Sequence, residues 1–251
     1  MKESSDKKIK EIEELKTEEI GTGIGKLLDF IGDRDLSVRL AAIEALSFFK
    51  ASSDAKRVLI ELTKDIDAEV RCYAIESLRN FPGSDVSNAI IPRLKDSDEL
   101  VRIAAAEVLG DLNSQQMIPY LQQALSDKGE LVRSYVAEAI GKIGDKELIS
   151  ILEEGLKKET RNRARLGFYA GLYRLDEKRY FDFILNMLKA KSYKVRCGAA
   201  NVLAELTDKN TASRVVESLE KALAREKTIA ARSSIMGSLS KLRKRFRLNS
   251  Q

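Results

Sequence analysis

The chain has 251 residues, with 44 lysines and arginines, 39 aspartates and glutamates, and no histidine, which gives a formal net charge of +5. The absence of histidine excludes Ser/His and Cys/His catalytic pairs and histidine-based metal sites. Hydrophobic residues make up 43% of the chain and aromatic residues only 6%. This composition provides a continuous core but favours thin helix pairs that pack through leucine, isoleucine, valine and alanine.

The N-terminal segment is predicted to close one end of a larger helical array. Lysine and glutamate alternate through residues 7–20, with apolar residues at loosely helical spacing. We therefore expect residues 1–21 to form a flexible start and a capping helix. Within them, residues 1–6 are expected to be disordered, and Gly21 and Gly23 are expected to break the helix.

A recurring motif organises the rest of the chain. Its clearest copy runs from Asp96 to Leu109, with an acid six residues before an arginine, an aliphatic residue directly before it and a leucine seven residues after it. The motif arginine returns at spacings of 32, 31, 31, 32, 31 and 36 residues, and a period of this size indicates a solenoid of stacked helical repeats. The seven arginines are Arg39, Arg71, Arg102, Arg133, Arg165, Arg196 and Arg232.

The residues around each arginine predict a turn followed by the second helix of a pair. The positions one before and three, four and seven after the arginine share one helical face and carry mostly small or aliphatic residues. An acid stands six residues before the arginine in every repeat except the sixth, which has Ala190. Residues of helix N-cap type stand four residues before the arginine in five repeats: Asp35, Asp67, Asp98, Ser192 and Thr228.

Apolar clusters upstream of each motif predict the first helix of each pair, so we expect seven helix pairs and no strand. Repeat five departs from the pattern, with a basic turn and an aromatic, glycine-containing run from Gly167 to Tyr173. Residues 241–247 form a basic run that should finish the last helix. The predicted division is residues 1–21 for the start and capping helix and residues 22–251 for a single solenoid with a basic C-terminal cap.

The repeated acid and arginine positions resemble the HEAT repeat, in particular the short HEAT-like repeats of the bilin-lyase type. The resemblance covers residues 22–242 and implies an all-α solenoid in which acids and arginines form a ladder along the stack. It implies little about function, because such arrays serve many tasks. Deoxyhypusine hydroxylase and alkylpurine DNA glycosylases also use such repeats, but they depend on histidines and tryptophans respectively, and this chain has neither residue.

No catalytic, cofactor-binding or metal-binding residue is predicted. Cys72 and Cys197 lie four repeats apart, too far for a disulfide or a shared zinc site. The glycine-rich segment 21–25 lacks the preceding strand and the lysine-serine ending of a phosphate-binding loop. The unpaired cysteines, the polar N-terminus and the absence of a long apolar run favour a cytoplasmic protein.

Charge is unevenly distributed along the chain. Residues 1–150 hold 21 lysines and arginines against 28 aspartates and glutamates, a net charge of −7. Residues 151–251 hold 23 against 11, a net charge of +12. An extended array would therefore have an acidic half and a basic half, which steer partners of opposite charge.

The second helices of HEAT arrays usually line the concave face, so their solvent-facing positions form the candidate binding surface. A glutamate stands five residues after the arginine in the first four repeats, and Glu44 is the first of this row. The row is either an acidic groove for a basic partner segment or a structural feature that pairs with arginines. The apolar and aromatic candidates are either exposed anchors or are buried between adjacent helices. The candidate partner-binding residues are Leu40, Tyr73, Glu76, Arg79, Ile103, Glu107, Tyr135, Glu138, Leu166 and Tyr173.

The sequence favours a non-enzymatic scaffold or adaptor that binds a partner protein along the concave face. One alternative is nucleic-acid binding by the basic C-terminal half, with base stacking by Tyr169 or Tyr173. Another is a bilin-lyase-like chaperone enzyme, although no chromophore-specific motif is present. Oligomeric state and the choice between adaptor, assembly factor and inhibitor stay open. The basic-patch residues are Arg161, Arg163, Arg174, Arg179, Arg243 and Arg245.

Overall fold

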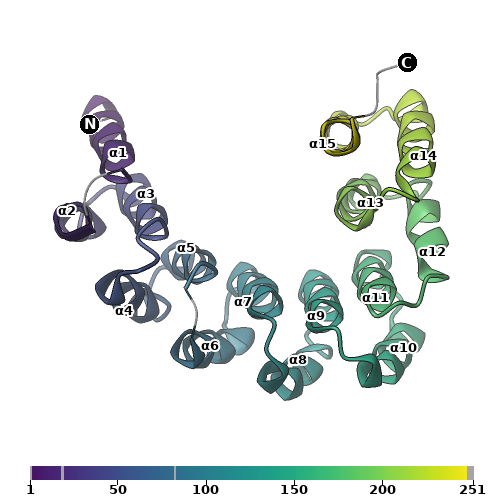
Figure 1. Ribbon diagram of the computed structural model, residues 1–251, viewed down its shortest axis with the longest axis horizontal. Helices are drawn as coiled ribbons and strands as arrows, with labels where there is room; N and C mark the ends of the chain where they lie inside the picture. The colour runs from purple at the N-terminus through teal and green to yellow at the C-terminus, as the bar shows by residue number, and fades with distance from the viewer. Residues whose placement is uncertain (1, 18–19, 82, 248–251) are drawn as a thin grey trace. The chain divides into compact units, whose positions relative to one another are not determined.

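The computed structural model describes residues 2–17, 20–81 and 83–247, and these residues are helical or form turns, with no strand among them (Figure 1). The chain divides into two compact units, Met1–Ala124 and Leu125–Gln251. Within each unit, consecutive helices pack as pairs and neighbouring pairs stack on each other. The expected all-α solenoid is therefore confirmed. In the described part of the chain, no helix is both long and apolar enough to cross a membrane.

Unit 1 begins with α1 (Lys2–Leu15) and continues with helix pairs. The second helices α3, α5 and α7 form a row in which each packs on the next, and α1 packs on α3 at the start of this row. The pairs are α2 (Ile20–Ile31) with α3 (Leu36–Leu46), α4 (Ser53–Leu62) with α5 (Ala68–Leu78), and α6 (Ser84–Ile90) and η1 (Ile91–Lys95) with α7 (Glu99–Leu112). The unit ends with η2 (Gln115–Met117) and α8 (Ile118–Ala124).

Unit 2 has the same organisation and opens with α9 (Glu130–Ile143). Its second helices α9, α11, α13 and α15 again form a row. The pairs are η3 (Lys146–Leu148) and α10 (Ile149–Lys158) with α11 (Asn162–Arg174), α12 (Tyr180–Met187) with α13 (Tyr193–Leu206), and α14 (Ala212–Arg225) with α15 (Ile229–Phe246). Each of the seven motif arginines is the fourth residue of a second helix, as the repeat register predicted.

The predicted N-cap residues begin their helices as expected. Asp35, Asp67 and Asp98 are the N-caps of α3, α5 and α7, and each carboxylate accepts a hydrogen bond from a backbone N–H of the first turn. Ser192 and Thr228 occupy the same position before α13 and α15, without such a side-chain bond. The turn chemistry of the motif therefore sets where each of these second helices starts.

The N-terminal helix differs from the prediction at both ends. It begins at Lys2, so residues 2–6 are helical rather than disordered. The Ser5 hydroxyl donates to Asp35 at 2.5 Å, and Lys8 Nζ lies 2.5 Å from Asp33 Oδ2, so contacts with the first motif turn hold this segment in place. Residues 1 and 248–251, which belong to the predicted start and cap, lie outside the described residues.

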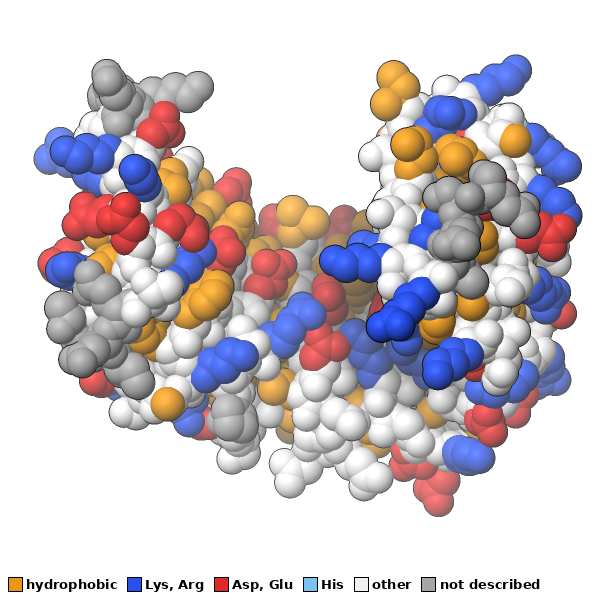
Figure 2. All heavy atoms as spheres, turned by 45° about the horizontal axis from the view of Figure 1, so that its top comes forward, with side chains coloured by type: hydrophobic (Ala, Val, Ile, Leu, Met, Phe, Trp, Pro, Cys, Tyr) orange, Lys and Arg blue, Asp and Glu red, His pale blue; other side chains and the backbone are white. Residues whose placement is uncertain are grey.

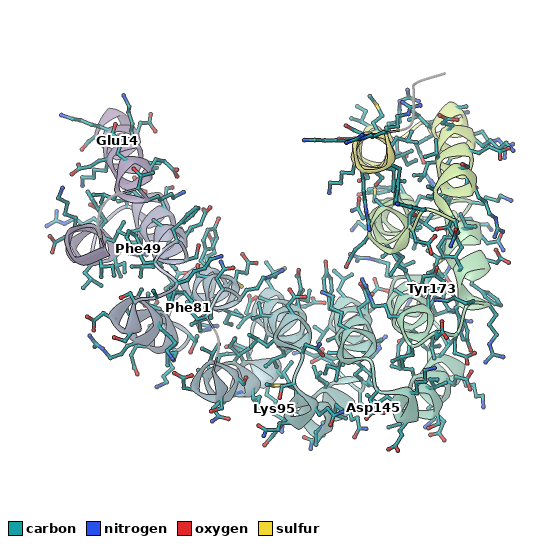
Figure 3. The ribbon with its side chains drawn as sticks, viewed as in Figure 1. Glu14, Phe49, Phe81, Lys95, Asp145 and Tyr173 are labelled. Atoms are coloured by element: carbon teal, nitrogen blue, oxygen red, sulfur yellow. The ribbon has the colours of Figure 1, made fainter. Side chains whose placement is uncertain are left out.

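The predicted break at two glycines is also wrong. Gly21 and Gly23 lie inside α2, and α1 already ends at Leu15. A Cβ on Gly23 would lie 2.8 Å from the ring of Phe49, a buried residue that follows α3 (Figure 3). Gly23 therefore provides space for packing between the two helices of the first pair instead of ending a helix.

The motif arginines form a ladder along each unit. In all seven repeats, arginine Nη1 donates to the backbone carbonyl six residues earlier, at 2.7–3.1 Å. Several arginines also reach the motif acid of the next repeat. Arg71 binds Asp96 with two bonds of 2.7 and 3.0 Å. Arg196 binds Glu226 with two bonds of 2.5 and 2.8 Å, and Arg133 Nε donates to Glu159 at 2.6 Å. These charge-assisted bonds connect consecutive turns and confirm the expected ladder.

The ladder changes where repeat six has Ala190 in place of the acid. Arg165 makes no ion pair among the described residues, and its Nε and Nη2 donate instead to the Tyr169 hydroxyl at 3.1 and 2.8 Å. The Tyr169 ring is buried and packs against Tyr180 and Phe183, with centroid distances of 5.8 and 5.2 Å. The aromatic run of repeat five thus supplies the acceptor that repeat six lacks.

The backbones of α9 and α11 approach each other closely at glycines. A Cβ on Gly167 would lie 2.1 Å from the carbonyl oxygen of Ser134, and one on Gly171 would lie 2.3 Å from that of Ala137. Real Cβ atoms do not make such contacts, so these positions require hydrogen as the side chain. The unusual glycines of repeat five therefore have a packing role.

Gly171→Ala should destabilise the protein by roughly 1–3 kcal/mol, because the added methyl group forces two packed helices apart. The matched control is Gly237→Ala in α15, where a Cβ meets nothing within 4 Å. That change should be neutral or stabilise by about 0.5–1 kcal/mol through helix propensity. Urea unfolding followed by circular dichroism measures both. A higher midpoint for Gly171→Ala would contradict the close approach of α9 and α11.

The ladder also predicts a pH dependence of stability at Glu226. Hydrogen bonding to Arg196, opposed by burial and assisted by the Thr228 N–H, lowers the pKa of Glu226 from 4.5 to about 2. Because the folded-state pKa is depressed, this contribution is complete above the ordinary pKa of 4.5 and is lost as the pH falls toward 2. Glu226→Gln should therefore have a lower Tm than the wild type at pH 7, with a gap that narrows between pH 4.5 and 2. A gap that stays constant would contradict a role for the carboxylate charge.

Candidate functional site

Three glutamates lie on consecutive second helices of unit 1, and we call them the unit 1 glutamate row. Glu44 on α3 and Glu76 on α5 are exposed, and Glu107 on α7 is half-buried. Although Glu76 keeps accessible surface, neighbouring atoms displace part of the water around its carboxylate and raise its pKa; the charges of Glu107 and Glu44 raise it further, and Arg79 opposes them. The carboxylates are therefore close enough to repel one another and form one strip of negative charge.

Arg79 neutralises only one end of this row. Its Nη2 lies 3.1 Å from Glu107 Oε1, and its Nη1 lies 2.7 Å from Asp111 Oδ2. Among the described residues, Glu44 and Glu76 have no ion pair and accept no side-chain hydrogen bond. Pairing with arginine thus accounts structurally for Glu107, whereas two carboxylates of the row are left available to a partner.

Half-buried side chains border the row. Tyr73 and Ile103 follow the motif arginines of α5 and α7 and keep part of their surface accessible. Cys72 is also half-buried, and burial, with a smaller contribution from the charge of Glu76, raises its pKa to about 11. Its thiol is therefore protonated near neutral pH and unreactive as a nucleophile. Of the two alternatives for Leu40, burial between adjacent helices holds, because packing of the stack leaves it only 8% exposed.

Of the candidate partner-binding residues in unit 2, two keep part of their surface accessible and two are buried. Tyr135 and Glu138 on α9 are half-buried. Of the two alternatives for Leu166 and Tyr173, burial holds, since these residues are 5% and 8% exposed. A Cβ on Gly198 would lie 2.8 Å from Leu166 Cδ2, so α13 covers that leucine.

Tyr173 belongs to an aromatic cluster rather than to a free surface (Figure 3). Its ring centroid lies 5.0 Å from that of Phe181, and Lys178 Nζ lies 4.5 Å from the same ring. Leu166 and Tyr173 therefore stabilise the stack instead of anchoring a partner. Tyr169 is buried as well, so neither tyrosine has a free face on which a base can stack.

Most of the predicted basic patch is already neutralised. Arg161 and Arg245 are exposed and have no acidic partner among the described residues; the Arg245 guanidinium lies 5.1 Å from the Phe246 ring centroid. The other four arginines form ion pairs with glutamates from several different helices. These pairs are Arg163 with Glu130, Arg174 with Glu205, Arg179 with Glu153 and Glu177, and Arg243 with Glu220.

A further surface in unit 2 was not predicted from the sequence. A pocket of about 720 Å³ opens between α12 and α14 and is lined mainly by basic and aliphatic side chains. Lysine and arginine also predominate over acids on the unit 2 surface seen in Figure 2. The one sequence signal at this pocket is Ala190, which lines it in place of the motif acid.

The repulsion within the glutamate row gives a measurable consequence. Glu107→Gln should lower the pKa of Glu76, because it removes a negative neighbour and leaves Arg79 in place. Arg79→Met should raise the pKa of Glu76, because it removes the positive neighbour. NMR titration of ¹³C-labelled glutamate side chains distinguishes the two. Identical Glu76 titration curves in both variants would show that the three side chains do not interact.

The fold and part of the sequence are similar to known proteins. Residues 87–172 match the family model for HEAT repeats. The structure of the CpcE–CpcF complex of phycocyanin lyase from Nostoc sp. PCC7120 matches with 20% identity and a TM-score of 0.61, over 86% of this chain and 93% of that chain. The Escherichia coli protein YibA matches with 19% identity and a TM-score of 0.53, over 93% and 95%. At these identities the likeness shows the fold alone. No curated protein matches by sequence.

Proposed function

We propose that this HEAT-like solenoid is a non-enzymatic scaffold that binds a basic segment of a partner protein along the unit 1 glutamate row. The observation that carries this proposal is the pair Glu44 and Glu76, two exposed carboxylates on adjacent second helices that form no ion pair among the described residues. Partial desolvation raises the pKa of Glu76, and repulsion by Glu107 and Glu44 raises it further against the opposing charge of Arg79. A lysine or arginine from a partner would relieve this repulsion, so the row favours cationic ligands.

The repeat spacing sets the form of the segment that fits. Packed helix axes lie about 8–10 Å apart, so neighbouring glutamates of the row recur at about that interval. An extended peptide advances about 3.3 Å per residue, so basic residues about three positions apart would meet successive glutamates. Tyr73 and Ile103 would supply apolar contact beside the charges, and tyrosine is enriched among residues that dominate binding energy.

The structural relatives support a role in protein association. The similar structure of CpcE and CpcF is a complex of two proteins. It is also described as a phycocyanin lyase, which makes a bilin-lyase-like activity the competing candidate. Mixing the chain with a bilin and recording the visible spectrum separates the two, since a changed absorption band would favour the competing candidate.

Charge reversal of the row should weaken binding of a basic peptide at least tenfold. The probe is a fluorescent 13-residue peptide with lysine at every third position and serine between, measured by anisotropy. Glu44→Lys with Glu76→Lys turns two attractions into repulsions, each worth about 0.5–1 kcal/mol at an exposed site. A peptide with the same lysines clustered at one end should bind less tightly to the wild type.

The matched control reverses two exposed acids on the first helices of the same unit, Asp29→Lys with Glu61→Lys, for an equal change in net charge. This control should keep its affinity for the spaced peptide. Equal losses in both double variants would contradict a site at the row. Capture from native lysate with nuclease identifies the natural partner, which should be retained by the control variant and lost by the row variant.

A further inference from the structure

The α12–α14 pocket is large enough to hold one or two side chains of a ligand, because small-ligand sites span about 300–1,000 Å³. It lies wholly within unit 2, between two consecutive first helices. Its lining includes Leu185 of α12, Lys189 and Ala190 of the turn after it, and Lys221, Ala222 and Arg225 of α14. The pocket is thus bounded by the C-terminal end of α12, by most of the length of α14 and by the turns that follow both helices, with Arg196 of α13 beside them.

Charge in this pocket is not balanced. Three of its cations have acidic partners: Arg196 pairs with Glu226, Arg214 with Asp182, and Lys221 with Glu217. The other three, Lys189, Arg225 and Lys227, are exposed and make no ion pair among the described residues. Three uncompensated positive charges around one hollow favour a ligand with oxyanions.

The repeat pattern explains part of the pocket's apolar lining. The other six repeats hold an acid at the position that Ala190 occupies. Ala190 lines the pocket, so this position adds apolar surface where the other repeats have a carboxylate. Leu185 and Leu188 contribute further apolar surface beside it, and both are largely buried.

The combination of charges and apolar surface indicates which oxyanion ligand fits. Among the described residues that line the pocket, none is aromatic, so it has no ring on which a nucleic-acid base can stack. A surface of leucine and alanine instead matches an aliphatic side chain. We propose that the α12–α14 pocket binds an acidic peptide segment in which a leucine-like residue is flanked by aspartates or glutamates. This site is in unit 2 and is independent of the glutamate row, so either proposal can fail alone.

The test uses the full chain and a fluorescein-labelled peptide, Asp-Glu-Asp-Glu-Leu-Glu-Asp-Glu-Asp, with binding followed by anisotropy. Lys189→Glu with Arg225→Glu should weaken binding at least tenfold, because both residues are unpaired cations of the pocket. Ala222→Phe fills the pocket without changing charge and should also weaken binding. Replacing the central leucine of the peptide by serine should reduce affinity for the wild type severalfold.

The control is Lys157→Glu with Lys158→Glu on α10, since both lysines are exposed and the net charge changes equally. Lys158 stands seven residues before its motif arginine, as do Lys189 and Arg225, but it does not line the pocket. This control should bind the peptide like the wild type. Equal weakening by both double variants, or no effect of the leucine-to-serine change, would overturn the proposal. Tighter binding of a single-stranded oligonucleotide of equal charge would overturn it in favour of nucleic acid.

Discussion

The hydrogen bonds of the arginine at the fourth position of each second helix fix how consecutive repeats stack, and the candidate surfaces depend on this stacking. The stack covers this arginine in α5 and α7, where Arg71 and Arg102 are only 8% and 3% exposed, and leaves Arg232 of α15 exposed. A charge removed from water must be hydrogen-bonded and paired, or it costs several kcal/mol. The arginine donates to a carbonyl of its own turn in every repeat, and at Arg39, Arg71, Arg133 and Arg196 it also pairs with an acid of the next turn. Since this geometry recurs, residues at equal distances from each arginine face the same direction, and the glutamates five positions later become a row.

The need of each motif arginine for an acceptor also bears on two features of unit 2. These are the bond from Arg165 to Tyr169 and the lining of the α12–α14 pocket. When Ala190 replaces the motif acid, the guanidinium of Arg165 still needs an acceptor, and the buried Tyr169 hydroxyl provides it. The tyrosine in turn requires aromatic neighbours on α12. Ala190 also lines the α12–α14 pocket beside Lys189, at a position where the other repeats have a carboxylate. The change at this position therefore accounts for the altered acceptor of Arg165 and for part of the pocket's apolar lining.

Predictions that rest on the period of the repeat are confirmed, whereas the helix break expected at Gly21 and Gly23 and several expectations that depend on neighbouring helices are not. The register of second helices, the N-caps and the ladder follow from residues at fixed spacing. The burial of Leu166 depends on how closely α13 approaches, and Gly198 permits that approach. Helix formation from Lys2 depends on contacts that Ser5 and Lys8 make with a turn about 25–30 residues away. The sequence predicted more uncompensated positive charge in the basic patch than the structure has. Four of its arginines pair with glutamates that are distant in the sequence, and a sequence pattern does not reveal such contacts.

Net charge alone therefore does not locate a binding surface in this protein. Unit 1 has 17 lysines and arginines against 23 acids, and unit 2 has 27 against 16. Many of these charges cancel in ion pairs, and screening limits the reach of the exposed ones to about 8 Å at physiological salt. At the two candidate surfaces, the described charges that form no ion pair are Glu44 and Glu76 in unit 1 and Lys189, Arg225 and Lys227 in unit 2. The charges of each surface lie beside half-buried or apolar side chains. A ligand selective for either surface must therefore match both the charge and the shape of that surface.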